Sequence, residues 1–140
     1  MKAFIFCLKM FKPMYNYDPE KSKSPLLKKS FLLAIEIVKL SRYLIEEHKE
    51  FVLSRQILKS GTNPGAMTRA AAHAQSGKDF INKLEIAQKE LNETAYWLQL
   101  LLATNLISKD QYHPIYNLNH EVKRMTRSSI LTKKKNLGLL

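Results

Sequence analysis

Residues 76–104, SGKDFINKLEIAQKELNETAYWLQLLLAT, decide the fold of this chain. Within them, apolar and small residues recur in alternating steps of four and three, at Phe80, Leu84, Ala87, Leu91, Thr94, Leu98 and Leu101. On a helix with 3.6 residues per turn this spacing makes a single stripe, which must be buried. Ser76 and Asp79 have the spacing of an N-cap and its partner, and neither Pro nor Gly interrupts residues 78–104. The stretch therefore predicts a helix of about 28 residues, about 42 Å long.

An earlier helix is predicted to begin at Ser24, the N-cap, and Pro25, at the first helical position, and to run to about Glu47. It carries two apolar rows: Leu26, Leu33, Ile37, Leu40 and Leu44 form one, and Leu27, Phe31, Ala34, Val38 and Ile45 form the other. A surface helix of a monomeric bundle usually needs one such stripe. The second row predicts a second covered surface, either against another subunit or against the N-terminal extension.

Residues 49–75 predict a helix whose second half, SGTNPGAMTRAAAHA, consists mainly of small residues. These residues favour close approach of a neighbouring helix over a ligand-binding loop, and no GxxxxGK[ST] phosphate loop is present. Pro64 removes a backbone hydrogen bond, which predicts a kink near Ser60–Pro64. A last helix, from Lys109 to about Leu131, follows the capping pattern of Ser108 with Gln111. Its expected buried face is Tyr112, Ile115, Leu118, Val122, Met125 and Ser129.

These patterns together predict an all-α protein, an antiparallel up-down-up-down four-helix bundle with a kinked second helix. No stretch alternates apolar and polar residues as a half-buried strand does. We expect residues 1–23 to be an N-terminal extension that is flexible or loosely docked, residues 24–131 to be the bundle, and residues 132–140 to be a basic flexible tail. The lone cysteine, Cys7, and the lack of a long apolar run indicate a cytoplasmic protein without a membrane segment.

The formal charge of +11 is concentrated near the two ends of the chain. Residues 1–29 contain seven Lys/Arg and two acids, residues 108–140 again seven and two, whereas residues 30–107 contain nine and eight. A polyanion would therefore meet the ends. The candidate nucleic-acid-binding residues are Lys123, Arg124, Arg127, Lys133, Lys134 and Lys135, with Arg69 and Arg55 as secondary candidates. If the first six each neutralised a phosphate, affinity would fall roughly a thousandfold between about 50 and 200 mM salt. The alternative is that this charge serves solubility alone.

Catalytic and metal-binding patterns are largely missing, so we expect no enzymatic activity, metal or cofactor. A di-iron bundle needs Glu-x-x-His motifs, and Asp110-x-x-His113 is a single near-match. Glu90 and Glu93 lie one turn apart and could do acid–base work only in a pocket that raises a pKa. Three hypotheses follow: a nucleic-acid-binding bundle, a protein-interaction scaffold without nucleic-acid contact, and an enzyme that uses Glu90 and Glu93.

The segments FVLSRQILKSGTNPGAMTRAAAHAQSGKDFINKL and IAQKELNETAYWLQLL resemble the bacterial "four helix bundle protein" family, first associated with intervening sequences of 23S ribosomal RNA genes. The matching residues, in order, are Ser60, Gly61, Thr62, Ala74, Gln75, Ser76, Asp79, Phe80, Lys83, Leu84, Ala87, Glu90, Glu93, Thr94, Tyr96, Trp97 and Leu98. The resemblance departs at residues 67–70, MTRA, where family members more often show a run like Asn-Ile-x-Glu, and residues 1–23 have no recognisable counterpart.

The resemblance implies a bundle that assembles into a ring, a homopentamer. It also implies kinship with the accessory subunit of diversity-generating retroelements, a basic pentamer that binds nucleic acid and a reverse transcriptase. It implies no enzymatic activity. The expected partners are therefore other copies of this chain and nucleic acid, with RNA favoured, together with a reverse transcriptase or ribosomal RNA, and no membrane.

Overall fold

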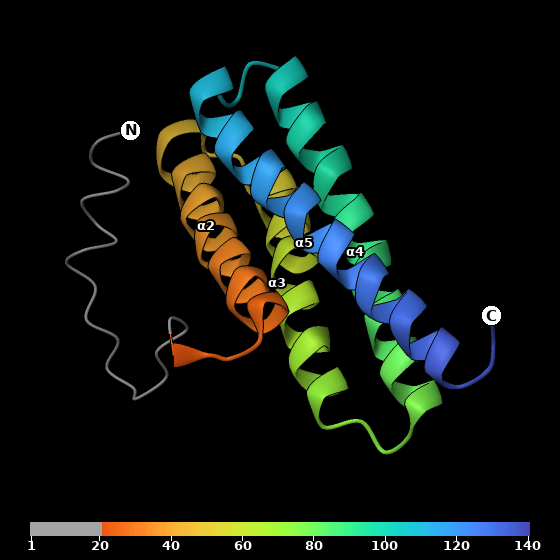
Figure 1. Cartoon of the computed structure of the whole chain (residues 1–140). Helices are drawn as coiled ribbons and strands as arrows, with labels where there is room; N and C mark the ends of the chain where they lie inside the picture. The colour runs from red at the N-terminus through yellow and green to blue at the C-terminus, as the bar shows by residue number, and fades with distance from the viewer. Residues whose placement is uncertain (1–20) are drawn as a thin grey trace.

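The computed structural model describes residues 21–140, which form four helices without a strand. These are α2 (Pro25–His48), α3 (Val52–Ala72), α4 (Gly77–Ala103) and α5 (Lys109–Asn136), shown in Figure 1. The all-α, four-helix prediction is confirmed. Predictions about residues 1–20, including Cys7 and most of the N-terminal extension, lie outside the described residues. No helix within residues 21–140 is long and apolar enough to cross a membrane.

Each helix packs against two others, α2 against α3 and α5, and α4 against the same two. The core therefore lies in the middle of a ring of four. Contacts between α2 and α3 give their relative direction. The Ser41 hydroxyl donates to the Ser54 carbonyl at 3.1 Å, whereas Ser30, near the start of α2, lies beside Gly65, late in α3. These two helices therefore run in opposite directions, and Figure 1 shows the chain turning back at every connection.

The three predicted caps begin their helices. Ser24 Oγ accepts from the Leu27 N–H, Ser76 Oγ from the Asp79 N–H, and Ser108 makes the capping box with Gln111. In α4 the buried stripe is Ile81, Leu84, Ala87, Leu91, Thr94, Leu98 and Leu101. Ile81 takes the place predicted for Phe80. The Phe80 ring is half-buried at the edge of the core and opens onto a hollow beside α5.

The small residues of α3 allow α2 to come close, as predicted. A Cβ on Gly61 would lie 2.5 Å from Ile37 Cγ1, and one on Gly65 would lie 3.2 Å from the Ser30 carbonyl oxygen. On the other side of α3, Thr94 Oγ1 of α4 donates to Ser60 Oγ at 3.0 Å in a buried contact. Helix α3 continues past Pro64 to Ala72, and the kink there stays a prediction.

Helix α5 differs most from its prediction. It continues past Leu131 to Asn136, so Lys133, Lys134 and Lys135 lie on a helix rather than in a flexible tail. Neither Gly nor Pro interrupts residues 115–137, and the lysines of the last turn complement the negative end of the helix dipole. Leu137 also packs against Gly77 of α4, which holds the end of α5 alongside α4. The helix is thus extended by contacts with α4.

The buried face of α5 is rotated from the predicted one and consists of Tyr112, Ile115, Asn119, Val122, Thr126 and Ile130. Leu118, Met125 and Ser129 are half-buried at its edge. Hydrogen bonds to backbone carbonyls make the polar members of this face tolerable in the core. Asn119 Nδ2 donates to the Leu91 carbonyl at 3.0 Å, and Thr126 Oγ1 donates to the Val122 carbonyl at 2.7 Å.

Substitution of Gly61 tests the close contact of α2 and α3. Gly61→Ala should lower the free energy of unfolding by about 1–2 kcal/mol, because the overlap with Ile37 outweighs the gain in helix propensity. Gly77→Ala is the matched control, since its new Cβ would meet the end of the flexible Leu137 side chain. Urea unfolding at one fixed protein concentration measures both variants. A Gly61→Ala protein as stable as the native one would contradict the proposed contact.

Candidate nucleic-acid interface

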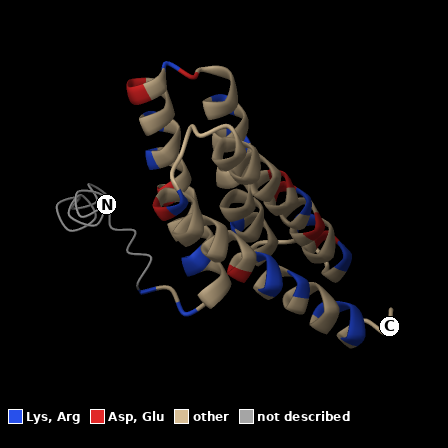
Figure 2. Ribbon diagram, turned by 90° about the horizontal axis from the view of Figure 1, so that it is seen from above, with Lys and Arg blue, Asp and Glu red and all other residues tan. Residues whose placement is uncertain are grey.

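The second half of α5 carries a group of cations on one helix. Arg124 and Arg127 are exposed and lie one turn apart, and Lys123 is half-buried beside them. None of the three makes an ion pair with a residue in 21–140. Figure 2 shows Lys and Arg positions following this half of α5 towards the C terminus. Since no acid follows Glu121 in the sequence, the positive charge of this half of α5 is not balanced by acids on α5 itself.

The three lysines of the last turn have different surroundings. Lys134 Nζ lies 2.9 Å from Glu85 Oε1 of α4, and Lys133 Nζ lies 5.4 Å from the centre of the Phe80 ring. Lys135 is exposed and makes no ion pair with a described residue. Four of the six predicted cations, Lys123, Arg124, Arg127 and Lys135, therefore make no ion pair within residues 21–140. Four phosphate contacts would lower affinity about 150-fold between about 50 and 200 mM salt, less than the thousandfold expected for six.

The two secondary candidates lie away from this group. Arg55 is exposed on α3, next to Ser54, whose carbonyl accepts from Ser41. Ser41 lies about 24 Å along α2 from Pro25, and the Pro25 end of α2 is the one that meets the basic half of α5. Arg55, beside Ser41, is therefore far from the cations of α5. Arg69 lies on α3 with its guanidinium carbon 5.7 Å from the centre of the Phe31 ring. The structure thus brings together the six α5 residues but neither Arg55 nor Arg69.

The start of α2 contributes to the same region. The residues predicted from the sequence did not include this contribution. Lys29 Nζ lies 3.3 Å from Glu121 Oε1 of α5, so the last acid of α5 is neutralised from α2. The excess of lysine in residues 1–29 was the only available signal. It could not be assigned to this site, because sequence alone does not show that α2 packs against α5.

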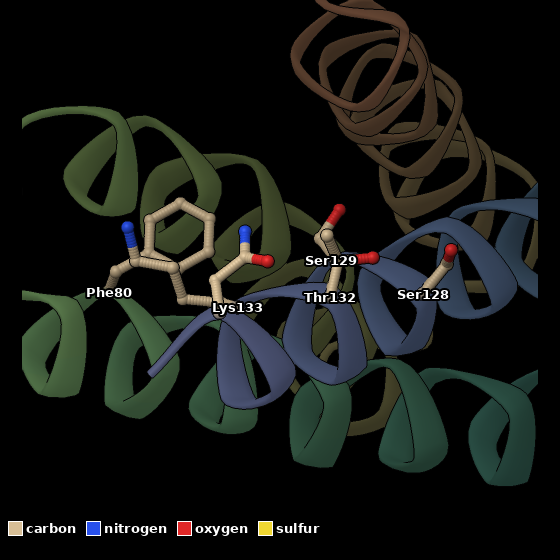
Figure 3. A pocket seen from close by; sticks show the side chains of 6 residues that line it. Phe80, Ser128, Ser129, Thr132 and Lys133 are labelled. Carbon is tan, nitrogen blue, oxygen red and sulfur yellow. The ribbon is translucent and has the colours of Figure 1, made fainter. Parts of the chain in front are cut away.

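Two open hollows lie along this part of α5. One, of about 280 Å³, is lined by Phe80, Ser128, Ser129, Thr132, Lys133 and Asn136. The other, of about 590 Å³, is lined by Ser24, Pro25, Leu26, Glu121, Arg124, Met125, Ser128 and Ser129. Because Ser128 and Ser129 line both, the two hollows are neighbours along α5, and together they are called the α5 groove below. Figure 3 shows its α4 end, where Phe80 and Lys133 lie together and the hydroxyl side chains continue along α5.

The residues considered for catalysis do not meet in either hollow. Glu93 is exposed. Glu90 is half-buried, and its buried Oε2 has no hydrogen-bond partner within residues 21–140. Burial raises the pKa of the Glu36 carboxyl above its usual value, and Lys39, 3.7 Å away, acts in the opposite direction. Glu36 lies on α2 and lines neither hollow. Within residues 21–140, no three His, Cys, Asp or Glu side chains gather as a metal site would require.

Comparisons with known proteins identify a family and a similar solved structure. The model of a family described as "23S rRNA-intervening sequence protein" matches residues 22–128. A crystal structure of a protein of unknown function, from the S23 ribosomal protein family of Bacteroides thetaiotaomicron, is 50% identical with a TM-score of 0.74. The match covers 75% of this chain and 97% of that one. The comparison with curated proteins gave no match.

Proposed function

The chain belongs to the 23S rRNA-intervening sequence protein family, and from this premise we propose that it is a non-enzymatic, homo-oligomeric bundle that binds RNA through α5. The observation that carries the proposal is the row of cations along the second half of α5. Lys123, Arg124, Arg127 and Lys135 lie along one helix and make no ion pair with residues 21–140. A row of like charges without counter-charges attracts a polyanion, and neutralising phosphates releases the counterions that surround it.

The choice of RNA over DNA rests on the family name, which refers to a ribosomal RNA. The cations themselves would contact phosphates, and such contacts position a protein on nucleic acid without selecting a sequence. We therefore propose general binding to RNA, with ribosomal RNA as the first candidate. Lys134 and Lys133 contribute less than the four unpaired cations, since each already has a partner on α4.

Self-association is supported by the second apolar row of α2. Leu27, Phe31, Ala34 and Val38 are all half-buried, and among the described helices α2 packs only against α3 and α5. Ile35, also half-buried, lies beside this row. A band of this kind, on the face of α2 next to the one that fills the core, fits an interface between subunits. We propose the homopentamer that the family resemblance implies.

Placing a charge in this row tests self-association. Val38→Glu should shift the protein towards smaller species in sedimentation velocity experiments, because an unpaired carboxylate is strongly disfavoured in an apolar interface. Asn92→Glu is the matched control: it adds the same charge at an exposed position on α4, which does not pack against α2. A native protein that sediments as a single subunit would refute the oligomer, as would a Val38→Glu protein of unchanged size.

Removal of two exposed arginines tests RNA binding. Arg124→Gln with Arg127→Gln should lower the slope of log affinity against log salt by about 1.4–1.8, the effect of two phosphate contacts. The measurement is fluorescence anisotropy with a labelled RNA hairpin that carries an unpaired tail. Arg55→Gln with Lys59→Gln changes the net charge equally at exposed positions of α3 and should leave the slope unchanged.

Two results would contradict RNA binding through α5. One is the absence of binding by the native protein at about 50 mM salt, where phosphate contacts are strong. The other is an equal loss in the two double variants, which would mean that only total charge matters. Either result would favour the alternative, a protein-interaction scaffold whose charge serves solubility.

A further inference from the structure

The α5 groove has a chemistry that the exposed cations alone do not supply. Ser128 and Thr132, one turn apart on α5, line it, and their hydroxyls make no hydrogen bond to a residue in 21–140. Ser129 Oγ already donates to the Met125 carbonyl at 3.0 Å. The groove therefore presents two hydroxyl groups that are free to donate to a ligand.

The charges at the groove favour an anionic ligand. Arg124 lines the α2 end of the groove, and Lys133 lines the α4 end. The single carboxylate among the lining residues, Glu121, is paired with Lys29 at 3.3 Å. The start of α2 adds the positive end of its helix dipole. Hydroxyl donors between two cations match the oxygens of a phosphodiester chain.

The groove also contains an aromatic ring, which a phosphate chain alone would not need. Phe80 is half-buried at its α4 end, and Lys133 Nζ lies 5.4 Å from the centre of the ring (Figure 3). Lysine has a long flexible side chain, so Lys133 can leave the ring for a phosphate and expose the ring to a base. Proteins that bind single strands combine a basic groove along the backbone with aromatic rings on which bases stack.

The position of these donors favours a single strand over a duplex. Arg124, Ser128, Thr132 and Asn136 follow one another at intervals of one turn, which places the row over about 18 Å of α5. The row lies in a recess whose other walls come from the start of α2 and from Phe80 of α4. Stacking a base on Phe80 needs an unpaired base, which a flexible single strand can supply, whereas the bases of a double helix are paired and stacked on one another.

We infer that the α5 groove binds a single-stranded segment of RNA, with phosphates on Arg124, Ser128, Thr132 and Lys133 and a base on Phe80. The inference rests on the proposed RNA binding and names the part of the RNA that this chain contacts. Thr132, Lys133 and Asn136 lie beyond residue 128, where the family match ends. This half of the groove is therefore outside the part of the chain that the family model describes.

Two uncharged substitutions separate the groove from general attraction between charges. Phe80→Leu removes the ring but keeps an apolar side chain against the core, and Thr132→Val removes one hydroxyl at an exposed position. With the full-length protein and a labelled oligouridine, each should weaken binding about tenfold, the scale of one lost base stack or one hydrogen bond to a charged group. A blunt-ended RNA hairpin should bind to the native protein more weakly than oligouridine does. The affinity of each variant for this hairpin should equal that of the native protein.

Tyr96→Leu is the matched control for the ring, because Tyr96 is an exposed aromatic residue on the same helix, 56% exposed and outside the groove. It should leave binding of oligouridine unchanged. Thermal unfolding verifies that each variant is folded. If Phe80→Leu does not fold, the exposed Thr132→Val substitution carries the test alone.

Each remaining outcome has a distinct meaning. If both groove variants bind oligouridine as the native protein does, while the Arg124 and Arg127 double variant binds less, RNA binding through α5 stands and the groove is excluded. Equal affinity of the native protein for oligouridine and for the blunt hairpin also excludes the groove as a single-strand site. If neither RNA binds at about 50 mM salt, the proposed function and the inference both fail.

Discussion

At one end of the bundle α5 extends further than α2, and the functional surface depends on this difference. Ser24 caps α2 and Pro25 occupies its first position, so α2 begins beside Glu121, Arg124 and Met125 of α5. Helix α5 continues for several turns to Asn136, held there by contacts with α4. Beyond the start of α2, one flank of α5 has no neighbour from α2. The half of the groove that is lined by Thr132, Lys133 and Asn136 lies along this stretch, where α2 does not cover it.

The rest of the bundle depends on close packing and on polar contacts between helices. The α2–α3 contact depends on Gly61 and Gly65, where a side chain would meet Ile37 or the backbone of Ser30. The buried polar residues of α4 and α5 are small or amide-bearing and donate to nearby acceptors, as Thr94 and Asn119 do. The excess of lysine and arginine lies outside the core, since every Lys and Arg within residues 21–140 is exposed or half-buried. Its concentration on α5 follows from the sequence after Glu121, which contains no acid.

The sequence predicted those features that depend on local chemistry. The caps at Ser24, Ser76 and Ser108 and the stripe of α4 follow from hydrogen-bond geometry and a 3.6-residue period, and both are confirmed apart from the exchange of Phe80 for Ile81. The end of α5 could not be found in this way, because residues 132–136 are polar and carry no periodic signal. Its stability comes from Leu137 on Gly77 and Lys134 beside Glu85, contacts between distant parts of the chain. The place of Phe80 beside Lys133 depends on the same docking and was therefore missed.

The most direct test measures where RNA protects the protein. Hydrogen–deuterium exchange of the full-length protein, with and without oligouridine, reports on backbone amides along every helix. We expect slower exchange in the second half of α5, around Phe80 and at the start of α2, with no change around Arg55 and Tyr96. Protection confined to the α2–α3 connection, or no protection under conditions where oligouridine is bound, would contradict a binding surface on α5.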